Sequence, residues 1–137
     1  MENLPSLPND SSTCTGSLHP QAVAGLHLFN AGEYFEAHEA LETAWREEAG
    51  PARELYRGVL QVAVAYYHLT RGNYIGTLKM FARARYWLAL FPERCRGIEV
   101  GRLMADAQAV EAEVRRLGPN RLDLLDRAAL KPVVWEK

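Results

Sequence analysis

Residues 52–71 carry apolar side chains around most of the circumference of one predicted helix, and this feature constrains the fold more than any other. A helix that is apolar on most sides has to be covered by neighbours on most sides. The rest of the chain must therefore supply several helices that pack around it. The apolar positions are Leu55, Val59, Val62, Ala63, Tyr66 and Leu69.

Four other segments have apolar residues at helical spacing, and glycine or proline separates them from one another. They cover residues 20–30, 34–48, 74–90 and 100–117, and "RLDLLDRAAL" near the C-terminus predicts one more short helix. No segment alternates apolar and polar residues as a strand would. We therefore predict an all-α fold, a bundle of about five helices.

Two stretches of the chain resemble each other at an offset of 40 residues. "GEYFEAHEALETA" begins at Gly32 and "GNYIGTLKMFARA" begins at Gly72. A Gly-x-Tyr start followed by small and large apolar residues is typical of tetratricopeptide-like antiparallel hairpins. Two copies are too few for a solenoid, so we expect one such hairpin at the heart of the bundle.

The length of 137 residues predicts a single domain. We expect a flexible N-terminal tail over residues 1–18, a helical domain over residues 19–130 and a C-terminal tail over residues 131–137, because residues 1–18 show no apolar period. Cys14 falls in the expected tail, which argues against a structural disulfide with Cys95 and favours a reducing cytoplasm.

Charge and hydropathy exclude few classes of function. The net charge is −1, and no apolar run is long enough to cross a bilayer, so we expect no membrane association. Residues 33–48 carry six glutamates against one arginine, while residues 55–98 carry seven Lys or Arg against one glutamate. The acidic helix argues against a nucleic-acid partner. No cofactor motif is present, so none is predicted.

The stretches "FNAGEYFEAHEALETAW" and "LYRGVLQVAVAYYHLTRGNYIGTL" together resemble the domain-of-unknown-function family 309, a set of small all-helical proteins. The resemblance covers roughly residues 20 to 90. It implies a helical bundle and gives no reaction. The matching positions are Phe29, Gly32, Tyr34, Phe35, Glu36, His38, Glu39, Glu42 and Trp45, then Gly58, Gln61, His68, Gly72 and Asn73.

The polar residues of the second and third helices should meet in an antiparallel hairpin around Gly50. In such a hairpin, residues at the same level have numbers that sum to about 100. We therefore expect Glu42 beside Arg57, and Gly58 to leave room for Trp45 or a ligand. The candidate ligand-binding residues are His38, Glu39, Glu42, Arg57, Gln61 and His68.

Three hypotheses explain this group. In the first, the residues form a buried hydrogen-bonded network, with a Glu42–Arg57 pair whose disruption would cost on the order of 3–5 kcal/mol. In the second, they line a pocket for a small polar ligand or a protein partner. These two together define a binding or scaffold module.

The third hypothesis is a metal-assisted hydrolase. His38 and Glu42 are one helical turn apart and could face a divalent ion, with Glu39 as general base. The motif lacks the second histidine of the zinc-protease signature. A homodimer is a separate prediction, based on the aromatic residues Tyr74, Tyr86 and Trp87 on the fourth helix.

Overall fold

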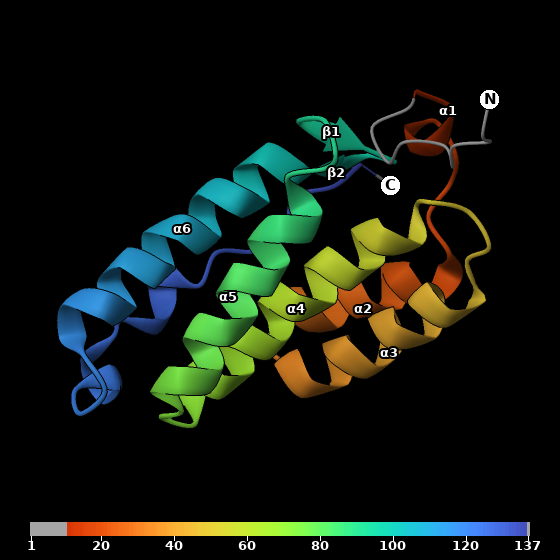
Figure 1. The fold of residues 1–137 in the computed structure, drawn as a ribbon. Helices are drawn as coiled ribbons and strands as arrows, with labels where there is room; N and C mark the ends of the chain where they lie inside the picture. Colours follow the sequence, from red (N-terminus) through yellow and green to blue (C-terminus); the bar gives the residue numbers. More distant parts are fainter. Residues whose placement is uncertain (1–10, 137) are drawn as a thin grey trace.

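The computed structural model describes residues 11–136 and shows an all-α bundle (Figure 1). Its five main helices are α2 (Pro20–Asn30), α3 (Tyr34–Glu47), α4 (Arg53–Thr70), α5 (Tyr74–Leu88) and α6 (Val100–Leu117). The predicted fold class is therefore confirmed, and each of these helices lies where the apolar spacing placed it.

The smaller elements precede the bundle, connect α5 to α6 and follow α6. A single turn, α1 (Ser11–Cys14), precedes the bundle, and strands β1 (Arg94–Cys95) and β2 (Ile98–Glu99) pair antiparallel between α5 and α6. The predicted last helix is instead two 3₁₀ turns, η1 (Leu122–Leu124) and η2 (Arg127–Ala129). The sequence did not predict the hairpin, because two-residue strands are too short to show alternation.

Helix α4 is the centre of the bundle. It packs against α3 on one side and α5 on the other, and α2 packs against α3. Nine of its residues are buried. The predicted central position of this helix is confirmed.

The two helical hairpins begin in the same way. Gly32 and Gly72 both have positive φ angles, of 81° and 74°, which glycine adopts without the steric penalty of a Cβ atom. The helix that follows starts at Tyr34 in one case and Tyr74 in the other. The repeat in the sequence therefore reflects two equivalent turns that lead into α3 and α5.

The segments at both ends of the described chain make specific contacts with the bundle. Asn30 at the end of α2 exchanges two hydrogen bonds with the backbone of Val133, at 2.9 Å and 2.8 Å. Val133 is buried, and Trp135 forms a bridge with Ile98. Residues 1–10 of the predicted tail lie outside the described residues.

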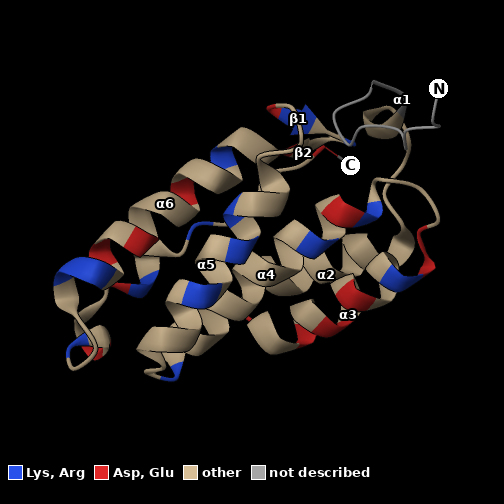
Figure 2. Cartoon of the chain, viewed as in Figure 1, with Lys and Arg blue, Asp and Glu red and all other residues tan. Residues whose placement is uncertain are grey.

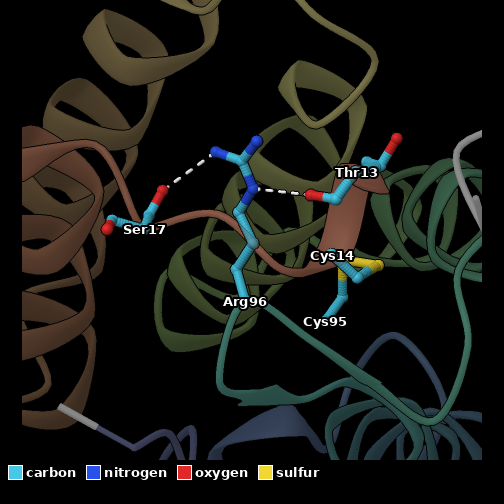
Figure 3. Close-up of a disulfide and its surroundings, with 5 residues drawn as sticks. All are labelled: Thr13, Cys14, Ser17, Cys95 and Arg96. Carbon is cyan, nitrogen blue, oxygen red and sulfur yellow. Dashed lines mark hydrogen bonds between the residues drawn. A yellow bond between two sulfur atoms is a disulfide. The ribbon is translucent and has the colours of Figure 1, made fainter. Parts of the chain in front are cut away.

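The prediction against a disulfide was wrong. Cys14 is bonded to Cys95, 81 residues later, and this bond links α1 to β1 (Figure 3). The side chain of Arg96 adds to the link, because its Nε donates to the carbonyl oxygen of Thr13 at 2.7 Å and its Nη1 to that of Ser17 at 2.9 Å. The chain near Cys14 is therefore held by two kinds of contact that residue composition does not reveal.

Candidate functional site

The predicted hairpin of α3 and α4 has the expected register. The ring of Phe35 contacts that of Tyr67, and Trp45 Nε1 donates a hydrogen bond to Glu54 Oε1 at 3.3 Å. The residue numbers of these two pairs sum to 102 and 99, close to the predicted value of 100. Residues along this face of the hairpin therefore lie at the levels that the sequence indicated.

The predicted pair of Glu42 with Arg57 does not form, and this expectation was wrong. Glu42 binds Arg46 one turn along its own helix at 3.2 Å, and Arg57 binds Glu54 on α4 at 3.0 Å. Both carboxylates are matched by an arginine on the same helix, which is within reach without any particular hairpin geometry. The register was right, but level alone does not decide which partner a long side chain takes.

Arg57 is instead part of an aromatic cluster. Its guanidinium carbon lies 4.8 Å from the ring centroid of Trp45 on α3 and 4.3 Å from that of Trp87 on α5. Arg53 also lies over Trp45, at 4.6 Å. The planar guanidinium is attracted to the electron-rich ring faces, so this Trp–Arg–Trp cluster joins three helices.

Gly58 does not leave room for Trp45 or a ligand, contrary to the prediction. A Cβ atom at this position would lie 2.6 Å from Cδ2 of Leu88. The glycine therefore permits the close approach of α4 and α5.

A small cavity opens between α3 and α4, nearer the Gly32 turn. Its volume is about 140 Å³, and its walls are mostly apolar and aromatic. Phe35 at its edge is 45% exposed. We call this the α3–α4 cavity, and its lining residues are Phe35, His38, Val64, Tyr67 and His68.

Two of the six predicted site residues line this cavity, and a third, Gln61, lies on α4 three residues before Val64 of the cavity wall. His38 and His68 form part of the wall. The Nδ1 atom of His38 and the Oε1 atom of Gln61 are buried and have no hydrogen-bond partner within residues 11–136. A buried polar atom without a partner is unfavourable, so each is a position where a bound polar group would add stability.

The remaining predicted residues lie away from the cavity wall. Glu39 is exposed, Glu42 is half-buried, and Arg57 belongs to the Trp–Arg–Trp cluster.

Burial lowers the pKa of His68 below its ordinary value, because the charged imidazolium loses hydration there. The neutral form of His68 is therefore favoured at the cavity.

The donors proposed for a metal ion do not come together. Within residues 11–136, no group of three or more His, Cys, Asp or Glu side chains is arranged to hold one. Glu42, the proposed ligand, is paired with Arg46. The hydrolase hypothesis therefore has no third protein ligand among the residues described.

A second polar pair lies in the interior and was not predicted. Tyr66 Oη and Asp106 Oδ2 are both buried without a hydrogen-bond partner in the described chain. Burial raises the pKa of Tyr66, and the nearby Tyr34 and Asp106 act in the same direction. No pattern in the sequence indicates that these two residues lie close together, because Asp106 is on α6, far along the chain from Tyr66.

Comparison with known proteins agrees with the resemblance seen in the sequence. Residues 22–80 match the model of a family described as "Domain of unknown function (DUF309)". This match includes all of α3 and α4 and the start of α5, and so contains the α3–α4 cavity. The predicted resemblance to that family is confirmed.

Two curated relatives match a similar part of the chain. The uncharacterized protein YpuF of Bacillus subtilis is 34% identical over 85 residues, which is 60% of this chain and 49% of the relative. An uncharacterized protein of Aquifex aeolicus is 30% identical over 88 residues, 61% of this chain and 26% of the relative. The chain thus spans half or less of the length of these relatives, and neither printed name states an activity.

Among the described residues, no helix is both long and apolar enough to cross a membrane.

Proposed function

We propose that this chain is a helical binding module whose α3–α4 cavity takes a small aromatic or aliphatic group that carries one polar atom. The observation that carries the proposal is the Nδ1 atom of His38, which is buried without a hydrogen-bond partner among residues 11–136, in a side chain that lines this cavity. An apolar wall with a single unpaired polar atom is typical of sites where shape gives affinity and one hydrogen bond gives orientation.

The size of the cavity supports a ligand group rather than a whole cofactor. Its volume of about 140 Å³ is close to that of an engineered protein cavity of about 150 Å³ that holds benzene. The exposed edge at Phe35 gives such a group a way in. The bound group could be a free small molecule or the side chain of a protein partner, since both present the same chemistry to the wall.

Phenol is a suitable probe because it combines one ring with one hydroxyl group that can pair with His38. We expect phenol to produce saturable NMR shifts in the imidazole of His38 and the methyl groups of Val64. Val64→Phe should abolish the shifts by filling the cavity, and His38→Phe should weaken binding by removing the polar partner.

His27→Phe is the matched control, since His27 packs against Trp135 away from the cavity and should not affect binding. Shifts that stay linear up to the solubility limit of phenol, or that persist unchanged in Val64→Phe, would contradict the proposal. Metal analysis of the purified untagged protein tests the hydrolase alternative, which requires near-stoichiometric metal.

A further inference from the structure

The two helices that flank α4 carry opposite charge on their exposed sides. Glu39 and Glu42 lie on the outer side of α3, while Lys79 and Arg83 are exposed on α5. Figure 2 shows acidic residues along α3 and only basic charge on α5, with α4 between them. This surface of the bundle is therefore acidic on one edge and basic on the other.

Side-chain contacts fix how residues of α3 and α5 line up along the bundle. Trp45 and Trp87 both contact Arg57, so they share one level. Near the other end, Phe35 contacts Tyr67, and Thr77 lies within hydrogen-bonding distance of the carbonyl oxygen of Ala65.

At the first level the α5 residue is 42 positions after the α3 residue. At the second, Ala65 is two residues before Tyr67 on the antiparallel α4, so Phe35 is level with position 75 and the offset is 40. Glu39 is therefore level with positions 79–81 and Glu42 with positions 82–84, within two residues of Lys79 and Arg83 respectively. Each residue of a helix adds about 1.5 Å of rise, so these offsets are only about 3 Å or less. Long charged side chains bridge such a distance easily.

We propose that this surface binds a second copy of the chain across a twofold axis parallel to α4. Such an axis keeps every residue at its level along the bundle and exchanges the two edges, so α3 faces α5 of the partner subunit. Glu39 then meets the partner's Lys79, and Glu42, which also binds Arg46 of its own helix, meets the partner's Arg83. The symmetry forms the same two contacts again on the other edge.

Exposed apolar side chains on the same two helices support this arrangement. Phe35 on α3 is 45% exposed, and Ile75 and Tyr86 on α5 are 61% and 64% exposed. Covering them would supply apolar area between the charged contacts, as in the cores of dimer interfaces. Near the axis, the charge of Arg57 is already matched by Glu54. Arg53 lies over the ring of Trp45 and donates to its carbonyl oxygen at 3.3 Å.

The sign pattern favours a second copy over a partner of uniform charge. A partner of one charge would be attracted by one edge of the surface and repelled by the other. A second copy related by this axis is attracted at both edges. The argument for the dimer needs no ligand in the α3–α4 cavity, although the first turns of the partner's α5 would lie level with it and close to Phe35 at its edge.

Paired charge reversals test the proposal directly on the full chain. One variant, Glu39→Lys with Glu42→Lys, makes both edges basic, and another, Lys79→Glu with Arg83→Glu, makes both edges acidic. Each variant alone should dimerise at least about tenfold more weakly than the unchanged chain, because like charges then face each other. An equimolar mixture of the two should form one-to-one heterodimers.

Sedimentation equilibrium from about 1 to about 100 µM would measure these associations, with circular dichroism to confirm that each variant is folded. Arg102→Glu and Asp123→Arg are matched reversals at exposed positions on α6 and η1, and neither should change dimerisation. If a variant does not fold, the neutral pair Glu39→Gln and Glu42→Gln replaces it and should also weaken the dimer.

A chain that remains monomeric at about 100 µM would overturn the proposal. A dimer that tolerates both reversals, or variants that fail to associate when mixed, would overturn the assigned interface. Phe35 borders the cavity and also lies in the proposed interface, so the phenol titration is repeated on Lys79→Glu with Arg83→Glu, which should bind phenol as a monomer. The outcome for the binding site and the outcome for the dimer can then be told apart.

Discussion

The guanidinium group of Arg57 lies over the ring of Trp87, with its central carbon 4.3 Å from the ring centroid. Trp45 contacts the same group from α3, and Glu54 binds its Nε at 3.0 Å. One side chain of α4 thus connects both neighbouring helices. This arrangement replaces the predicted Glu42–Arg57 pair as the main polar contact across the hairpin.

Arg57→Ala should destabilise the protein by about 1–2 kcal/mol, from two stacking contacts and one partly exposed ion pair. This is less than expected for a buried pair, because 27% of the Arg57 side chain remains exposed. Urea denaturation measures the change. Arg46→Ala removes the exposed pair with Glu42 and should cost less than about 0.5 kcal/mol. Equal effects of the two variants would show that stacking adds no stability.

Gly58→Ala should destabilise the protein by about 1–3 kcal/mol, because the added methyl group would overlap the side chain of Leu88. The second variant, Leu88→Ala, removes the atoms that clash. In a double-mutant cycle by urea denaturation, the two changes together should therefore cost less than the sum of their separate effects. Strict additivity would mean that α4 and α5 can separate at Gly58 without penalty.

Replacing both cysteines, as Cys14→Ser with Cys95→Ala, should lower the free energy of unfolding by about 2–4 kcal/mol. The bond closes a loop of 81 residues, and opening it increases the freedom of the unfolded chain. Thermal melts with and without dithiothreitol provide the measurement. The reductant should lower the melting temperature of the unchanged protein but not that of the variant, and insensitivity of both would contradict the prediction.

His68 should make the stability of the protein dependent on mildly acidic pH. Its pKa is lowered in the folded state, so the unfolded chain binds the proton first as pH falls below about 6.5. The contribution of neutral His68 is complete above that pH and is lost as pH falls through the folded pKa. Melting temperatures between about pH 5 and 7.5 should fall less steeply for His68→Gln than for the unchanged chain or for His27→Gln. An NMR titration that places the His68 pKa at or above 6.5 would contradict this prediction.

The cytoplasmic location stays a prediction, and the disulfide removes one of the observations that supported it. It relied partly on the absence of a disulfide, whereas Cys14 and Cys95 are bonded. Disulfides persist mainly in oxidising compartments, with exceptions among hyperthermophiles. The location must therefore be tested directly, for example by fractionation of cells that produce the chain.

The sequence by itself determined the helices, their order and the register of α3 against α4. These features depend on local rules. Apolar residues recur with the period of a helix, and Gly32 and Gly72 adopt backbone angles that other residues avoid. The contact of Phe35 with Tyr67 lies within two residues of the predicted register, because a short connection leaves an antiparallel hairpin little freedom to shift.

Only the tertiary structure decided which polar side chains became partners. The hairpin register predicts Glu42 beside Arg57. Arg57 instead binds Glu54 and lies against Trp87, which comes from a third helix. The disulfide likewise joins residues that are far apart in the chain, and packing alone brings Asp106 of α6 near Tyr66 of α4. Local pattern fixes which face of a helix is buried, but the choice among several partners at similar distance depends on how all the helices pack together.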